Sequence, residues 1–133
     1  MKAGDVFCFF NFKFSDGDTA PKKLMIILNT PQNAESYLVC LTTSVPRTWR
    51  PKIPGCHSTK NYYYISAAQD NFDLDTYIVF ERLYEIPVDQ LLNSCLKDGS
   101  YSLFELEPTL WNAIKNCIKR SQDIEQDILD RIA

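Results

Sequence analysis

One group of side chains that could contact nucleic acid lies in a long, proline-rich segment. Residues 45–61 contain three prolines and a glycine. Proline cannot donate a hydrogen bond to a sheet, so we predict a loop here. Arg47, Trp49 and Arg50 fall within this segment; guanidinium groups contact phosphates, and exposed aromatic rings stack on unpaired bases. These three residues are therefore candidates for binding a single-stranded nucleic acid, the alternative being that aromatic side chains near the loop belong to the core.

A second group emerges from the order of motifs in the first 44 residues. GDVFCFF (residues 4–10) opens a predicted strand. An acidic turn over residues 15–18, with Gly17 and Asp18, follows it, and residues 19–21 with Pro21 extend this loop. KKLMIIL (22–28) places two basic residues ahead of an aliphatic strand, and LVCLTTS (38–44) ends the next strand in hydroxyl side chains. This order resembles the MazF/PemK family of toxin ribonucleases from bacterial toxin–antitoxin systems. The resemblance covers most of the chain loosely and only these 44 residues specifically.

The resemblance implies an SH3-like barrel with a terminal helix, usually as a homodimer, that cleaves single-stranded RNA without a metal or other cofactor. The implied chemistry is attack of the ribose 2′-OH on the adjacent phosphate, which leaves a cyclic phosphate and a free 5′-OH. Such a reaction needs a cation near the phosphate and groups that handle two protons. An antitoxin protein is implied as a partner.

Carried over by motif, the catalytic arginine position of the family falls on Lys22, and the catalytic threonine falls on Thr42. Lys23 stands where the family has proline, Thr43 follows Thr42, and Asp18 lies near the acidic position of the loop; these three are expected to bind substrate. Lysine departs from the family because it is a point charge that cannot grip phosphate through two parallel hydrogen bonds.

Other interpretations remain open for these residues. Lys22 could simply guard a strand end, and Thr42 could be a strand-end hydroxyl without chemistry. The chain would then be a non-catalytic RNA- or protein-binding module on the same fold. A third interpretation is a structural or regulatory protein whose resemblance to the family is accidental.

Motifs of other enzyme classes and metal sites are absent from the sequence. It contains no GxGxxG, GxxxxGK, HExxH or GxSxG, and His57 is its only histidine. The five cysteines are widely spaced without a CxxC pair, so we expect no metal site, small buried cysteine side chains and a reducing compartment. Asp73 and Asp75 are interpreted as an acidic turn before a strand, with metal binding as the less favoured alternative.

Composition points to a globular protein with an uneven charge distribution. The chain has 133 residues, 45% of them hydrophobic, so we expect one domain over residues 1–133. Residues 1–64 carry eight Lys/Arg against four Asp/Glu, and residues 65–133 carry six against thirteen, which permits a basic face on an acidic protein. No apolar run approaches the roughly 18 residues of a membrane span and no signal peptide pattern begins the chain, so we expect a cytoplasmic protein without a membrane partner.

Hydrophobic periodicity predicts strands first and helices last. The predicted strands are residues 5–14, 22–28, 37–43, 62–66 and 76–81, with 82–86 as a continuation of the last. A short helix has Pro87 in its first turn and closes at Asp98-Gly99, and residues 101–106 are either strand or loop. One long amphipathic helix runs from Pro108 to about residue 132. This pattern indicates an α+β fold, a small curled antiparallel sheet or SH3-like barrel with a C-terminal amphipathic helix.

Overall fold

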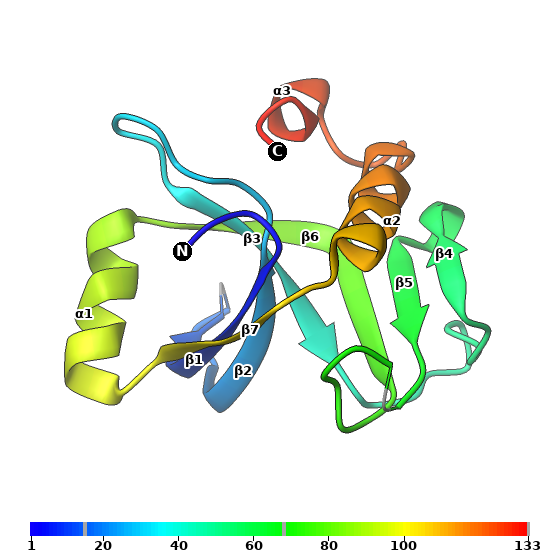
Figure 1. Ribbon diagram of the computed structural model, residues 1–133, viewed down its shortest axis with the longest axis horizontal. Coiled ribbons are helices and arrows are strands. Elements are labelled where there is room, and N and C mark those ends of the chain that lie inside the picture. The colour runs from blue at the N-terminus through cyan, green and yellow to red at the C-terminus, as the bar shows by residue number, and fades with distance from the viewer. Residues whose placement is uncertain (15, 68, 133) are drawn as a thin grey trace.

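A computed structural model describes residues 1–14, 16–67 and 69–132 and shows a small α+β domain built on one seven-stranded antiparallel sheet (Figure 1). The strands are β1 (Asp5–Lys13), β2 (Thr19–Ile27), β3 (Tyr37–Thr43), β4 (Gly55–His57), β5 (Tyr62–Ile65), β6 (Thr76–Ile86) and β7 (Tyr101–Glu105). The helices are α1 (Val88–Asp98), α2 (Pro108–Lys119) and α3 (Gln126–Leu129), with a 3-10 turn at Ser58–Lys60. The strand order β4-β5-β6-β3-β2-β1-β7 confirms the α+β prediction and the expected β1–β2–β3 meander.

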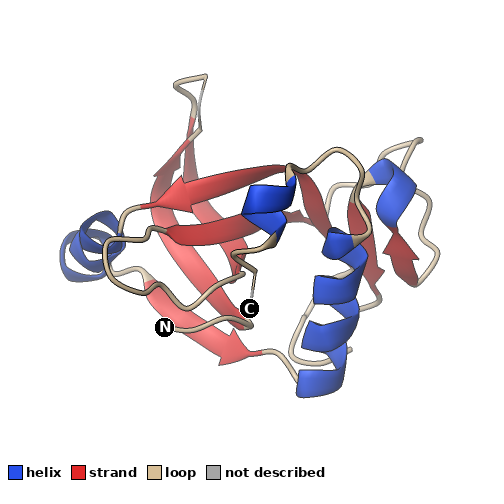
Figure 2. Cartoon of the chain, turned by 90° about the horizontal axis from the view of Figure 1, so that it is seen from above, coloured by secondary structure: helices blue, strands red, loops and turns tan. Residues whose placement is uncertain are grey.

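Alternation along the strands divides the core into two layers. Val6 and Ile26 belong to a cluster on one face of the sheet, which α2 covers with Leu110 and Ile114. Met25 and its neighbours on the other face pack against α1 in a second cluster. Figure 2 shows α1 at one end of the sheet and α2 at the other. α2 thus buries its apolar stripe on the sheet, whereas α1 buries Leu91 and leaves Val88, Leu92 and Leu96 exposed.

The sheet curls without closing. β4 and β7 are its edge strands, and no pairing joins them within the described residues. A loop nevertheless bridges the gap: the ring of Phe72 packs edge-on against Phe104 of β7 at 5.1 Å between centroids. The backbone N–H of Glu107 donates to Asp70 Oδ2 at 3.0 Å. The structure therefore shows an open, curled sheet, and the predicted SH3-like barrel is not established by it.

The predicted strands are confirmed, with one extension that needs a physical reason. β2 begins at Thr19, where we had expected a loop around Pro21. The ladder pairs Phe10 with Lys22 and Phe12 with Ala20, and it omits the position between them. Asn11 lies there with a φ of 56°. A local irregularity therefore accommodates a proline that cannot donate to the ladder.

The predicted long C-terminal helix is wrong, because the structure has two helices with a break between them. α2 ends at Lys119, and Ser121 is buried beyond it. The Ser121 hydroxyl donates to the side-chain oxygen of Asn61 and accepts from the backbone N–H of Asp123 at 3.3 Å. Such local side-chain bonds compete with helix hydrogen bonds and favour a break at this point. The apolar periodicity of the sequence continues beyond the break, which is why it predicted a single helix. No helix in the described residues has the length and apolar character that crossing a membrane requires.

Burial of small cysteine side chains, predicted for four of the five, is confirmed for Cys8, Cys40 and Cys117. Cys8 and Cys40 are buried free thiols, and burial raises the pKa of Cys40 to about 12. Cys56 and Cys117 instead form a disulfide between β4 and α2, with their Cα atoms 5.6 Å apart. β4 arises inside the segment that we had predicted as loop, and it brings together two cysteines separated by 61 positions. This bond also departs from the expected reducing environment.

Candidate functional site

A pocket of about 430 Å³ opens where the middle of β2 and the end of β3 meet the loop before β6 and the strand β7. Lys22 and Thr42 both line it, from neighbouring strands. The lining residues are Lys22, Lys23, Leu24, Thr42, Thr43, Ser44, Val45, Asn71, Phe72, Asp73, Leu74, Thr76, Leu103 and Phe104. The structure therefore brings together the two residues that the family resemblance implied as catalytic.

Thr42 and Thr43 both line this pocket, but as consecutive residues of β3 they direct their side chains to opposite faces of the sheet. The Thr42 hydroxyl is nearly buried and donates to the carbonyl oxygen of Leu24 at 2.9 Å. Thr43 pairs with Tyr77 of β6, and its hydroxyl accepts from the backbone N–H of Val45 at 3.2 Å. The Thr42 hydroxyl must therefore rotate away from Leu24 before it can donate to an anion in the pocket.

Two charged side chains of opposite sign also line the pocket. Lys22 and Asp73 are both exposed. Among the described residues, neither takes part in an ion pair or a side-chain hydrogen bond. The pocket thus presents an ammonium group and a carboxylate that are both free to meet a ligand.

Lys23 also lines the pocket, but its side chain joins the other predicted cations. It follows Lys22 along β2, so strand alternation sends its side chain to the opposite face. Burial lowers the pKa of Lys23, and the nearby charge of Arg50 lowers it further. The Arg50 guanidinium carbon lies 5.7 Å from the ring centre of Tyr77 and 5.9 Å from that of Trp49.

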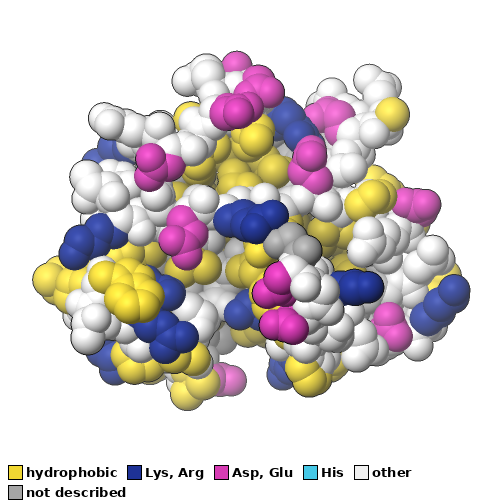
Figure 3. Space-filling model, turned by 180° about the vertical axis from the view of Figure 1, so that it is seen from behind, with side chains coloured by type: hydrophobic (Ala, Val, Ile, Leu, Met, Phe, Trp, Pro, Cys, Tyr) yellow, Lys and Arg dark blue, Asp and Glu magenta, His cyan; other side chains and the backbone are white. Residues whose placement is uncertain are grey.

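Arg47 completes this cation–aromatic cluster (Lys23, Arg47, Trp49, Arg50 and Tyr77), its guanidinium lying 6.0 Å from the Trp49 ring centre. Trp49 is 57% exposed, as its position among prolines and arginines predicted. Figure 3 shows Lys and Arg side chains beside hydrophobic groups at the lower left, over the end of the sheet that carries β4 and β5. Such a surface can contact phosphates and stack on bases.

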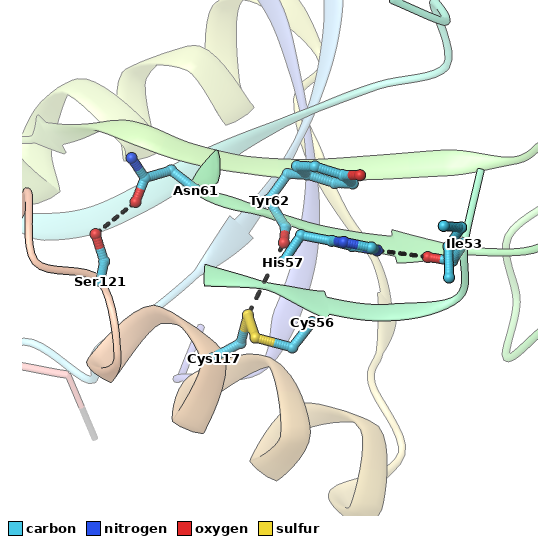
Figure 4. Close-up of a disulfide and its surroundings, with 7 residues drawn as sticks. All are labelled: Ile53, Cys56, His57, Asn61, Tyr62, Cys117 and Ser121. Atoms are coloured by element: carbon cyan, nitrogen blue, oxygen red, sulfur yellow. Dashed lines mark hydrogen bonds between the residues drawn. A yellow bond between two sulfur atoms is a disulfide. The ribbon is translucent and has the colours of Figure 1, made fainter. Parts of the chain in front are cut away.

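The loop that carries this cluster is fastened to the edge of the sheet (Figure 4). His57 Nε2 lies 2.7 Å from the carbonyl oxygen of Ile53, and the imidazole stacks on Tyr62 at 4.4 Å between ring centres. The Tyr62 hydroxyl donates to the carbonyl oxygen of Pro51 at 3.1 Å. The neighbouring Cys56 ties β4 to α2 through the disulfide. The only histidine therefore has a structural contact that fixes the loop.

The structure places the predicted site residues in three places, two of which share Lys23. Lys22, Lys23, Thr42 and Thr43 line the pocket. Lys23 also belongs to the cation–aromatic cluster, together with the loop residues Arg47, Trp49 and Arg50. Asp18 lies at the exposed β1–β2 turn, where its backbone oxygen accepts from Phe14 at 2.7 Å, and it does not line the pocket. Ser15, which belonged to the same predicted turn, lies outside the described residues.

Sequence reasoning missed the pocket wall formed by Asp73, Leu74 and Leu103. Of these three residues, the sequence singled out only Asp73, as part of an acidic turn with metal binding as the less favoured alternative. Within the described residues, no group of three or more His, Cys, Asp or Glu side chains could hold a metal ion.

Comparison with known proteins adds no assignment. Neither the models of known families nor the curated proteins match this chain. The function is therefore argued below from the site itself and from the resemblance in motif order.

Proposed function

We propose that this protein is a toxin-like endoribonuclease of the MazF/PemK type that cleaves single-stranded RNA without a metal. One observation carries the proposal: Lys22 and Thr42, from adjacent strands, line the same pocket. A phosphate placed there would meet a free ammonium group and, once it leaves Leu24, the Thr42 hydroxyl. That combination suits a reaction in which negative charge grows on a phosphate.

The chemistry is an internal transfer within the RNA. The ribose 2′-oxygen forms a bond to phosphorus while the bond from phosphorus to the 5′-oxygen breaks. The proton of the 2′-OH leaves, and a proton is delivered to the departing 5′-oxygen. Lys22 stabilises the added charge on the phosphoryl oxygens, and Thr42 donates a hydrogen bond to them once its hydroxyl leaves Leu24.

The cation–aromatic cluster holds the flanking RNA. The segment 43–47 connects the two places, because Thr43 lies in the pocket wall and Arg47 begins the cluster. A strand that crosses the end of the sheet along this segment would place one phosphate near Lys22 and stack an unpaired base on Trp49. Binding of the RNA therefore depends on both the pocket and the cation–aromatic cluster, whereas the reaction depends on the pocket alone.

The finer architecture and the partners in this proposal are those that the resemblance to the MazF/PemK family implies. The curled sheet, bridged by the contact of Phe72 with Phe104, corresponds to the SH3-like barrel of the family. A homodimer and an antitoxin protein follow from the same resemblance. Val88, Leu92 and Leu96 form an exposed apolar row on α1 that is available for such an interface.

The test is incubation of the protein with a mixed single-stranded RNA in the presence of a chelator. Fragments with 2′,3′-cyclic phosphate and 5′-OH ends support the proposal, and intact RNA rejects it. The Lys22→Ala variant shows that the activity belongs to this protein, with Lys13→Ala as the matched control because Lys13 is also an exposed lysine, on β1.

A non-catalytic RNA-binding module is the second candidate, and two observations favour it. Lys22 stands where the family has arginine, and the Thr42 hydroxyl is occupied by Leu24. In that case Trp49 fluorescence responds to single-stranded RNA although no cyclic phosphate ends appear.

A further inference from the structure

Three apolar side chains around the pocket are open to solvent. Leu74 is 64% exposed, Val45 47% and Leu103 40%, and all three line the pocket. Single exposed leucines are ordinary, but several that gather around one pocket with a polar rim mark a surface that binds a ligand. The pocket therefore offers more than an anion site, because part of its wall suits a flat or apolar group.

The wall is held in position by contacts on both sides of it. Phe72 is buried against Phe104, and Asp70 accepts from the backbone of Glu107. On the other side, Asp75 accepts from the backbone N–H of Ala67 at 2.7 Å. Asp73 and Leu74 thus project from a loop whose flanking residues are fixed, as a preorganised binding site requires.

The charges of the pocket complement this apolar wall. Lys22 attracts an anion, and an ionised Asp73 carboxylate can only accept hydrogen bonds. A ligand that satisfies all three features carries a phosphate, a ring that packs on aliphatic side chains, and an N–H donor. The volume of about 430 Å³ lies within the range of roughly 300–1,000 Å³ that is usual for small-molecule sites.

We infer that the pocket binds one nucleotide of the RNA, with its phosphate at Lys22, its base against Leu74 and Leu103, and its exocyclic amino group donating to Asp73. Asp73 then selects bases that carry an amino group over uracil. Uracil presents carbonyl oxygens beside its single N–H, and these oxygens meet the carboxylate unfavourably. The role in RNA cleavage rests on the proposed function, whereas binding of the nucleotide does not.

The experiment compares cytidine 3′-monophosphate with uridine 3′-monophosphate as ligands of the whole protein. They differ by an amino group against a carbonyl at position 4 of the ring and by the proton on N3, and neither contains a bond that the proposed reaction would cleave. Hydrogen bonds to charged groups contribute about 1.5–3 kcal/mol, so the cytidine nucleotide should bind about tenfold more tightly or better. The Leu74 and Leu103 methyl signals in an NMR titration should shift with both nucleotides.

Asp73→Asn tests the selecting residue, because an amide of the same shape can donate as well as accept. The ratio of the two affinities should fall to within about twofold, since the charged acceptor is lost. Asp127→Asn is the matched control, an exposed aspartate on α3 that lies outside the pocket, and it should keep the wild-type ratio. Leu74→Ser should weaken both nucleotides alike.

Each outcome bears on one proposal. Equal affinity for the two nucleotides, no binding of either at millimolar concentration, or an unchanged ratio in Asp73→Asn overturns the base-selecting role. If Asp73→Asn abolishes RNA cleavage while the nucleotide preference stays intact, Asp73 handles a proton and does not read the base. A preference for the cytidine nucleotide without RNA cleavage supports base selection by the pocket and rejects the proposed nuclease activity. RNA cleavage without a nucleotide preference supports the nuclease activity and rejects base selection by Asp73.

Discussion

The pocket and the cation–aromatic cluster lie at the same end of the sheet but are built in opposite ways. The pocket rests on central strands, and its charged groups Lys22 and Asp73 have no partners among the described residues. The cluster rests on a loop beside the edge strand β4, and Arg50 lies against two aromatic rings. The disulfide between Cys56 and Cys117 ties β4, and with it this loop, to α2. The difference suggests that one side performs the chemistry and the other holds the substrate.

The largest expected effect comes from removing that tie. Closing a loop of 61 residues stabilises a fold by about 4 kcal/mol through the entropy of the unfolded chain. Reduction, or the variant Cys56→Ser, should therefore lower the free energy of unfolding by roughly that amount, measured in urea. Cys95→Ser is the control, since Cys95 is a half-buried free thiol on α1. Equal stability of the oxidised and reduced protein would show that β4 does not depend on the bond.

Neighbouring lysines on β2 provide the sharpest test of the division into two sides. Lys22→Ala should reduce kcat for RNA cleavage by about 10²–10³, as removal of an electrostatic stabiliser usually does. Lys23→Ala should leave kcat near wild type and raise KM a few-fold, because its side chain faces the cluster. Initial rates on a defined single-stranded RNA in chelator separate the two constants. A matching loss of kcat in both variants would contradict the division.

Trp49→Ala should weaken RNA binding without changing the chemistry. Stacking of one base on an aromatic side chain contributes about 1–3 kcal/mol, so the dissociation constant should rise roughly 5- to 150-fold. Filter binding to RNA in chelator, with the Lys22→Ala variant as background to prevent cleavage, gives the affinity. Trp111→Phe is a suitable comparison because Trp111 is partly buried beside Gly4 and lies far from the loop in sequence. If both changes weaken binding alike, Trp49 is not the stacking platform.

The regular parts of this fold could be predicted from the sequence because they depend on local residue patterns. Alternation predicted β1, and Pro87 with Gly99 located the ends of α1 to within one residue. Strand alternation also directs the side chains of Lys22 and Lys23 to opposite faces, although both residues line the pocket. β4 could not be predicted, because three residues in a proline-rich segment carry no usable period.

The missed half of the pocket has a different physical cause. Asp73 and Leu103 are about thirty positions apart in the sequence, and they meet only because the sheet curls until the loop before β6 reaches β7. Nothing local in either segment encodes that meeting. The lining of a pocket formed by sheet curvature therefore requires the tertiary structure, whereas the residues at its strand ends could be proposed from sequence order.

The smallest expected effect concerns the charge of Lys23. Burial, followed by the charge of Arg50, lowers the pKa of Lys23 in the folded protein below its value in the unfolded chain. Between those two pKa values the unfolded chain binds more protons, so stability rises with pH through that window, and below it the cost of holding the charge is fully present. Lys23→Met should therefore stabilise the protein at neutral pH, within the roughly 0.5 kcal/mol usual for partly exposed sites. The advantage should shrink when unfolding in urea is measured near the unfolded pKa of lysine; an advantage that stays constant with pH would assign the gain to packing of the methionine instead.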